Sequence, residues 1–315
     1  MTPSQLRTRL LRALALALAA QAASCCEVRE TSREVREDQP GTPWAPDTTC
    51  AAVCLYPINC SPGSRLVSCT LSGPVGSRVA ACVFEQSECP QRPIPASDCG
   101  RRYAGATVDG ARGCDDPLGA LFGSMAALEA ESIPAFEALA DALAAHGAPT
   151  RLQRAARRAA DDERRHTLAM GALAAAHGAT VPTVTAPARA TPTLVELARD
   201  NAVEGCVRET FGALVALWQA ERAADPTVRA TMRDIARDEL RHAALGWQID
   251  AWADAGLTPD DRAEVARAKR AAVAELRAAL GPADAAVVAR AGFPSHQQAL
   301  RLLDRCEAAV WQAAS

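Results

Sequence analysis

Two copies of the motif D-E-x-R-H, at residues 162–166 and 238–242, have the residue types and spacing of a metal site. Residues three apart lie on one face of an α-helix, so each copy directs a carboxylate and an imidazole to the same side. Carboxylates can bridge two cations, and mixed oxygen and nitrogen ligation suits iron or manganese. The motifs therefore predict ligands from two helices: Glu163 with His166, and Glu239 with His242.

A second pair of glutamates precedes the two motifs at nearly equal distances. Glu129 lies 34 residues before Glu163, and Glu204 lies 35 residues before Glu239. Each is followed seven residues later by a phenylalanine. The doubled pattern predicts four carboxylates and two imidazoles in matching halves, which is the ligand set of a dinuclear iron or manganese centre in a helical bundle.

The predicted ligands fall on the apolar faces of their helices. Steps of three and four residues lead from Met125 through Glu129 to Phe136, and from Ile235 through Glu239 to Leu245. A carboxylate in an apolar core is costly unless it is paired or coordinated. A pair of metal ions would remove that cost.

Two further glutamates compete for the ligand positions. Glu131 is two residues from Glu129, so it points roughly 200° away and is expected in solvent. Glu209 is five residues from Glu204, about 140° round an α-helix. We favour Glu204 because its Phe211 repeats the Glu129–Phe136 relation, and Glu209 stays the alternative. Glu209 falls on a face of small residues, which indicates close helix packing: Ala202, Gly205, Ala213 and Ala216.

These motifs resemble those of the ferritin-like superfamily of dinuclear carboxylate proteins, which includes bacterial monooxygenase hydroxylases, class I ribonucleotide reductase small subunits, rubrerythrins and soluble desaturases. Residues 129–136 (E-A-E-S-I-P-A-F) and 201–211 (N-A-V-E-G-C-V-R-E-T-F) are similar to those of a group of bacterial ferritin-like domain proteins. The resemblance covers roughly residues 118–252.

The resemblance also implies a role for each ligand. Glu163 and Glu239 would bridge the metals, Glu129 with His166 would complete one metal, and Glu204 with His242 would complete the other. Two aspartates would orient the imidazoles and two arginines would pair with them, although ordinary surface charge is the alternative for the arginines. These residues are Asp162, Asp238, Arg165 and Arg241. Tyr56 and Tyr103 precede the bundle, which argues against a stable tyrosyl radical within it.

The sequence predicts an all-α fold: a ferritin-like four-helix bundle over residues 115–257 with C-terminal helices over 258–315 that pack on it. His146 and His177 each precede a helix-ending glycine, so they are expected to be cations at helix C-termini rather than ligands. Residues 178–191 span roughly 43 Å when extended. A helix of 28 residues is about 42 Å long, so this linker can form one long crossover along the bundle.

The N-terminus has the pattern of an exported protein. Residues 1–24 combine basic residues with a short Ala/Leu run and predict a signal peptide. Small residues before Cys25 resemble a bacterial lipoprotein cleavage site, which predicts lipidation of Cys25 and attachment to a membrane; plain signal-peptide cleavage is the alternative. Residues 25–49 are charged and proline-rich and predict a flexible tether.

Residues 50–114 form a predicted disulfide-rich module. An even number of cysteines in an exported chain favours four disulfides, whose connectivity is open. The segment contains no histidine and no C-x2-C pair, so a zinc site is the weaker alternative. The cysteines are Cys50, Cys54, Cys60, Cys69, Cys82, Cys89, Cys99 and Cys114. Outside it, Cys206 and Cys306 are expected to form a disulfide or to remain buried thiols.

The composition argues against nucleic-acid binding as the function of the chain. A formal net charge of −3 gives no electrostatic footprint for nucleic acid. The leading hypothesis is an exported oxidoreductase that activates O2 or peroxide at two iron or manganese ions and receives electrons from a donor. The alternatives are a metal-binding or iron-oxidising protein without an organic substrate, and a structural lipoprotein whose bundle is a scaffold. The sequence leaves the substrate and the oligomeric state open.

Overall fold

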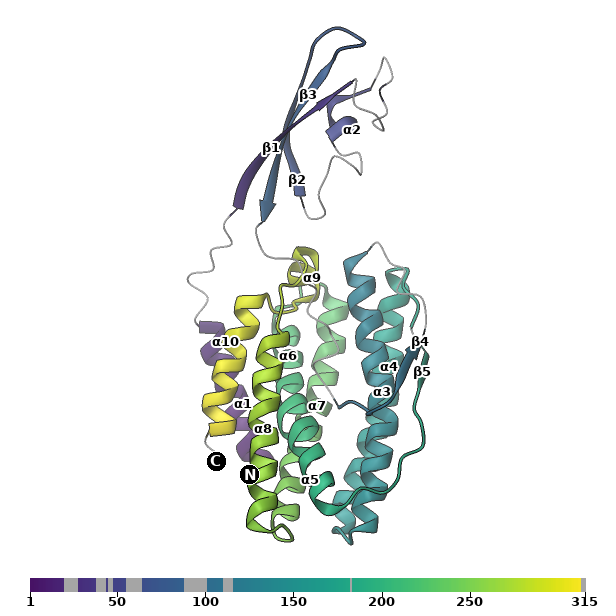
Figure 1. Ribbon diagram of the computed structural model, residues 1–315, viewed down its shortest axis with the longest axis vertical. Coiled ribbons are helices and arrows are strands. Elements are labelled where there is room, and N and C mark those ends of the chain that lie inside the picture. Colours follow the sequence, from purple (N-terminus) through teal and green to yellow (C-terminus); the bar gives the residue numbers. More distant parts are fainter. Residues whose placement is uncertain are drawn as a thin grey trace. The chain divides into compact units, whose positions relative to one another are not determined.

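The computed structural model describes residues 1–19, 28–37, 44, 48–54, 64–87, 101–109, 116–181 and 183–312. It divides into two compact units (Figure 1). Unit 1 contains Met1–Ala22 and Gln91–Ser315, and unit 2 is Ala23–Pro90. The described chain is mostly helical, as predicted. The cysteine-containing unit ends at Pro90 rather than at Cys114, because residues 101–109 pack against the helices of unit 1.

The first two long helices form an antiparallel hairpin. Helix α3 (Pro117–Ala145) begins after Asp116, whose side chain accepts a hydrogen bond from the backbone N–H of Leu118. Pro117 occupies the first helical position, where a backbone N–H would have no partner within the helix, so the missing N–H of proline costs nothing there. Helix α4 (Thr150–Ala176) follows after a turn in which Gly147 takes the left-handed conformation, with φ +65°.

The third long helix is interrupted by one wider turn. It consists of α5 (Leu194–Val203), the π-helical turn η2 (Glu204–Arg208) and α6 (Glu209–Arg222). Thr193 and Glu196 cap its start reciprocally. Helix α7 (Pro226–Asp254) then returns antiparallel to α6 and is capped by Asp225.

The linker between α4 and α5 runs along the helices from one end to the other. At one end, His177 Nδ1 lies 2.7 Å from a carboxylate oxygen of Asp116. At the other end, His146 Nε2 lies 2.7 Å from the carbonyl oxygen of Pro192. The linker therefore leads from the C-terminal end of α4 back along the helices to the start of α5, which is the long crossover that the sequence predicted. His146 and His177 lie at the C-termini of α3 and α4, also as predicted. Strand β5 (Thr183–Thr185) of this linker pairs with β4 (Thr107–Asp109).

Two glycines bring η2 and α7 into backbone contact. A Cβ added to Gly246 would lie 2.6 Å from the carbonyl carbon of Gly205 and 2.7 Å from its oxygen. A Cβ added to Gly205 would lie 2.9 Å from the Cα of Gly246. Only glycine at both positions allows this approach.

The C-terminal helices pack against the other helices of unit 1, as predicted. They are α8 (Pro259–Ala279), α9 (Ala285–Ala291), α10 (His296–Cys306) and the π turn η3 (Glu307–Trp311). The indole N–H of Trp311 donates to the carbonyl oxygen of Cys206 at 2.8 Å. Cys206 and Cys306 are both buried thiols rather than a disulfide.

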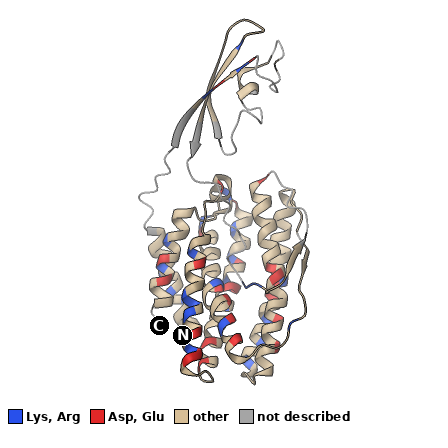
Figure 2. Ribbon diagram, viewed as in Figure 1, with Lys and Arg blue, Asp and Glu red and all other residues tan. Residues whose placement is uncertain are grey.

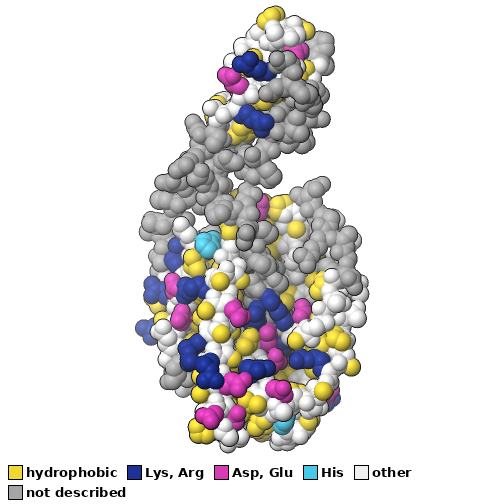
Figure 3. All heavy atoms as spheres, in the orientation of Figure 1, with side chains coloured by type: hydrophobic (Ala, Val, Ile, Leu, Met, Phe, Trp, Pro, Cys, Tyr) yellow, Lys and Arg dark blue, Asp and Glu magenta, His cyan; other side chains and the backbone are white. Residues whose placement is uncertain are grey.

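The N-terminal helix α1 (Pro3–Ala19) also packs on unit 1, where Leu6, Leu10 and Leu14 are buried in its main core. Removal of this segment as a signal peptide stays a prediction. Among the described helices, none combines the length and the apolar character needed to cross a membrane. Figure 2 shows acidic and basic residues interspersed along the helices, and Figure 3 shows the same mixture on the face in view.

Unit 2 contains a three-stranded antiparallel sheet in the order β1-β3-β2 and a short helix, α2 (Cys50–Cys54). The strands are β1 (Val28–Arg36), β2 (Ser64–Ser72) and β3 (Val79–Ser87). The predicted flexible tether is therefore partly wrong, because β1 pairs with β3 along its whole length. Cys54 and Cys82 form one of the expected disulfides. Cys50 and Cys69, which were also expected in disulfides, are free thiols in this structure. The remaining cysteine predictions lie outside the described residues: Cys25, Cys60, Cys89, Cys99 and Cys114.

The contact between η2 and α7 predicts that Gly246→Ala destabilises unit 1. The added methyl group would overlap backbone atoms of Gly205, and overpacking of this kind costs about 1–3 kcal/mol. Gly123→Ala in α3 is the matched control, since its Cβ would meet Thr180 O at an ordinary 3.5 Å. Thermal unfolding should show a lower Tm for Gly246→Ala and an equal or higher Tm for Gly123→Ala. Equal Tm values for both variants would contradict the close contact.

Candidate metal centre

The two D-E-x-R-H motifs place their glutamates and histidines opposite each other on α4 and α7. His166 Nδ1 lies 3.4 Å from an oxygen of Glu163 and 3.4 Å from an oxygen of Glu239. His242 Nδ1 lies 3.0 Å from Glu163 and 3.4 Å from Glu239. All four side chains are buried. Glu163 and Glu239 are therefore each within reach of both imidazoles.

One further carboxylate completes each half of the cluster. Glu129 on α3 lies 3.8 Å from His166 Nδ1, and Glu209 on α6 lies 3.9 Å from His242 Nδ1. The atoms of each half that can bind a metal lie within 4.8 Å of one another, and Glu239 belongs to both halves. We call these six residues the carboxylate–histidine cluster: Glu129, Glu163, His166, Glu209, Glu239 and His242.

The prediction that Glu204 belongs to this cluster is wrong, and Glu209 takes its place. One carboxylate oxygen of Glu204 accepts the backbone N–H of Arg102 at 2.9 Å. Its other oxygen lies 3.5 Å from Nε of Arg208. Glu204 therefore faces residues 101–103 and not the two imidazoles.

The π turn explains this exchange. The backbone N–H of Glu209 donates to the carbonyl oxygen of Glu204, five residues earlier. A turn closed at i→i+5 holds one residue more than an α-helical turn, so it shifts the register of everything that follows. The small residues on the same face as Glu209, including Gly205, are the feature of the sequence that could have pointed to Glu209, because that face packs on α7.

The segment 101–103 is held against α3 and η2 by Glu131 and Glu204, two carboxylates that lie outside the cluster. Glu131 accepts the backbone N–H of Tyr103 at 2.8 Å, so it does not point into solvent as expected. Ser132 Oγ donates to the carbonyl oxygen of Arg101 at 2.7 Å. Glu131 and Glu204 are therefore anchors for this segment.

Arg101 is a residue that sequence reasoning missed. Its side chain is buried, its guanidinium lies 5.2 Å from the ring centre of Phe136, and it donates to Asn201 at 3.3 Å. The Phe136 ring in turn lies 5.1 Å from the His242 ring. No local pattern marks Arg101, because its contacts are made with helices far along the chain.

The predicted aspartates contact the imidazoles across the helix pair. Asp238 on α7 lies 3.2 Å from Nε2 of His166, and Asp162 on α4 lies 3.3 Å from Nε2 of His242. Burial opposes protonation of both imidazoles, but the surrounding carboxylates raise their pKa values overall. If a metal were bound, the aspartate partner would keep the proton on Nε2 and leave the Nδ1 lone pair for the metal. The two arginines complete a neutral network, since each lies within 2.9 Å of both aspartates: Arg165 and Arg241.

The electrostatics of the cluster require positive charge. Burial and then the charge of Glu163 raise the pKa of Glu129 well above its usual value. Burial and then the charge of Glu239 raise the pKa of Glu209 in the same way. Burial also opposes ionisation of Glu163 and Glu239, but contacts with the two imidazoles lower their pKa values overall. Four carboxylates in one buried place cannot all ionise without cations.

Unpartnered atoms show where cations would fit. Within the described structure, Nδ1 of both histidines, both oxygens of Glu209 and one oxygen each of Glu163 and Glu239 are buried without a hydrogen bond. Buried polar atoms rarely lack a partner. Two divalent ions would balance four carboxylates, and this mixture of oxygen and nitrogen donors suits iron or manganese. The buried carboxylates and imidazoles could therefore hold metal.

A small cavity of about 40 Å³ borders the cluster at Glu129, Glu163 and Glu239. The rest of its wall is largely apolar and includes Met232 and Phe293. One water molecule needs roughly 10–15 Å³ of such space. The cavity therefore has room for molecules the size of water or O2.

Comparison with protein-family models, with curated proteins and with solved structures finds no match. The geometry of the cluster therefore carries the functional argument.

The cluster predicts that Glu209→Gln stabilises the metal-free protein at pH 7. The pKa of Glu209 is raised in the folded state, so the unfolded state gains stability as it ionises above pH about 4.5. The substitution removes that cost, so its gain in Tm should be present at pH 7 and should shrink at pH 4. Glu137→Gln, on an exposed position of α3, is the control and should change Tm little. A pH-independent loss of stability in Glu209→Gln would contradict the buried location.

Proposed function

We propose that unit 1 is a ferritin-like bundle whose carboxylate–histidine cluster binds two iron or manganese ions, and that the protein is an exported oxidoreductase that activates O2 or peroxide. The observation that carries the proposal is the doubled ligand set, with one carboxylate from each of four helical segments and one imidazole from each of α4 and α7. A scaffold without a metal has no need for so many unpartnered buried acceptors in one place.

The positions of the ligands fit a pair of ions. Glu163 and Glu239 lie within 3.4 Å of both imidazoles, so each would be shared between the two ions. Glu129 lies beside His166 alone, and Glu209 lies beside His242 alone. Each ion would thus receive one imidazole, one carboxylate of its own and the two shared carboxylates.

When bound, two iron or manganese ions would supply the redox chemistry, which is the transfer of one electron each to O2 or peroxide. The protein holds the imidazoles in orientation through Asp162 and Asp238. The Phe136 ring packs beside the His242 ring, and Arg101 lies over Phe136, so apolar and cationic groups adjoin this side of the cluster. The small cavity beside Glu129 and Glu163 provides room for the reactant on another side.

The location of the protein is part of the proposal. We place it outside the cytoplasm, anchored to a membrane through a lipid on Cys25, with an electron donor as partner. The Cys54–Cys82 disulfide supports an oxidising compartment, because structural disulfides persist mainly in exported proteins.

The size of the cavity favours a second candidate function, iron oxidation without an organic substrate. About 40 Å³ accommodates O2 or peroxide but no larger organic molecule without movement of the apolar wall. Oxygen uptake by the Fe(II)-loaded protein, measured with and without organic compounds, separates the two functions. A structural lipoprotein would show no metal-dependent uptake.

Element analysis of the full chain after anaerobic loading with Fe(II) should find about two ions per chain. Glu209→Ala should lose most of one ion, because it removes a ligand from the His242 half. Glu204→Ala and His146→Ala are the controls and should keep both ions, since neither side chain faces the cluster. Zinc as the only stoichiometric metal, or loss of metal in Glu204→Ala with retention in Glu209→Ala, would refute the assignment.

The crossed aspartates predict a separate effect on affinity. Asp162→Asn and Asp238→Asn should each weaken metal binding by about 10–100-fold, because partners of this kind fix the orientation of ligand imidazoles. Asp161→Asn is the control, since the Asp161 side chain is exposed and its carboxylate pairs with Arg164 rather than with an imidazole. Competition with a chelator measures these affinities, and equal affinities for all three variants would contradict the role of the aspartates.

A further inference from the structure

The short helix α2 of unit 2 carries a cysteine at each end. Cys50 and Cys54 are four residues apart, so they lie on one face of the helix. That face is directed at the sheet, because Cys54 forms its disulfide with Cys82 on β3. Cys50 therefore points to the same sheet one helical turn away.

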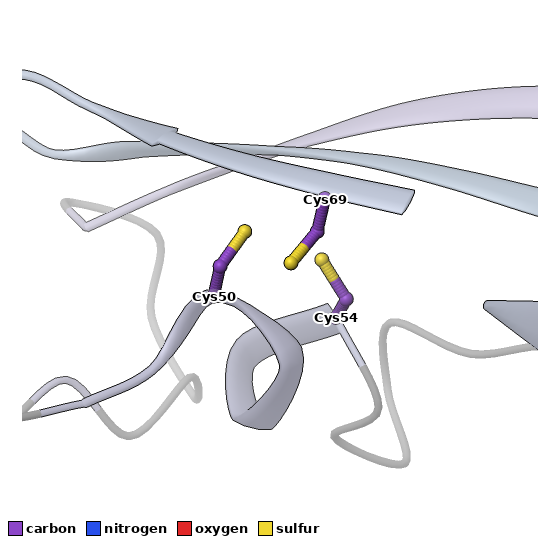
Figure 4. Close-up of side chains that lie close together, drawn as sticks. All are labelled: Cys50, Cys54 and Cys69. Atoms are coloured by element: carbon purple, nitrogen blue, oxygen red, sulfur yellow. The ribbon is translucent and has the colours of Figure 1, made fainter. Parts of the chain in front are cut away.

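The sheet presents a matching cysteine beside Cys82. Cys69 on β2 is the direct cross-strand partner of Cys82 in the antiparallel register. The sulfur atoms of Cys50, Cys54 and Cys69 all lie within 4.8 Å of one another. Figure 4 shows the three sulfurs gathered between α2 and the strand.

We propose that Cys50 and Cys69 form a second disulfide beside Cys54–Cys82, so that both ends of α2 are bonded to neighbouring strands. The two crosslinks would enclose the small core of unit 2, which includes Val35, Val53 and Phe84. The described part of unit 2 buries few apolar side chains, and domains of this size commonly depend on such crosslinks. The proposal is independent of the function proposed for unit 1.

The bond forms by thiol–disulfide exchange with an external disulfide, such as oxidised glutathione. Before unit 2 has folded and buried Cys50, the Cys50 thiolate attacks that disulfide, forms a mixed disulfide and releases one thiol. The Cys69 thiolate then attacks the Cys50 sulfur and releases the second thiol. Two cysteine thiols lose two electrons and two protons, and the external disulfide is reduced to two thiols.

Two other roles for these thiols fit the structure less well. A structural zinc site needs four ligands, and the Cys54–Cys82 bond leaves only Cys50 and Cys69 in this group. A reactive redox site needs a thiolate, whereas burial and then the neighbouring Cys69 raise the pKa of Cys50 to about 12. The position suits a permanent crosslink that forms during folding.

Peptide mapping of the full chain tests the pairing. The protein is purified without reductant, alkylated under denaturing conditions and digested with trypsin. Residues 66–78 form a tryptic peptide with Cys69 as its one cysteine, and residues 37–65 contain Cys50, Cys54 and Cys60. The two peptides should be linked, and fragmentation between Cys50 and Cys54 should place the bond on Cys50.

Alkylated Cys69, a bond from Cys69 to any other cysteine, or stoichiometric zinc in a protein that lacks the Cys54–Cys82 bond would overturn the proposal. The double variant Cys50→Ser/Cys69→Ser adds a second measurement. It should retain the Cys54–Cys82 link and be cleaved faster by protease within unit 2 than the parent chain. The matched variant Cys206→Ser, which removes a buried thiol of unit 1, should leave that cleavage rate unchanged. Equal cleavage rates for the double variant and the parent would also count against the crosslink.

Discussion

The structure of unit 1 depends on the burial of four carboxylates at one point between helices. Charge in an apolar interior is costly unless it is compensated. Here the inner compensation comes from two imidazoles and, in our proposal, from two divalent ions. The outer compensation is a neutral network, in which two aspartates hold the imidazoles and two arginines hold the aspartates: Asp162, Asp238, Arg165 and Arg241. With the two ions bound, this layering would concentrate the charges while keeping each one paired.

The arrangement of the chain follows from the need to bring these groups together. The long crossover allows two antiparallel hairpins to face each other, so that α4 and α7 present equivalent motifs. The contact between Gly205 and Gly246 brings η2 close to α7, and the π turn directs Glu209 inward. The segment 101–103 then covers this side through the carboxylates that remain, Glu131 and Glu204.

The sequence predicted the parts that depend on local geometry. Each motif needs only an α-helix to place its glutamate and histidine together, and the crossover follows from linker length. The choice between Glu204 and Glu209 was missed because it depends on a π turn, which a pattern with 3.6 residues per turn cannot represent. The charged strand β1 was missed because its order comes from pairing with β3, about fifty residues away.

Anomalous diffraction at the iron edge, from crystals of the protein loaded anaerobically with Fe(II), tests the central claim most directly. We expect two peaks, each next to both Glu163 and Glu239, with one beside His166 and Glu129 and the other beside His242 and Glu209. A peak beside Glu204, a single peak at the cysteines of unit 2, or no peak between α4 and α7 would contradict the account.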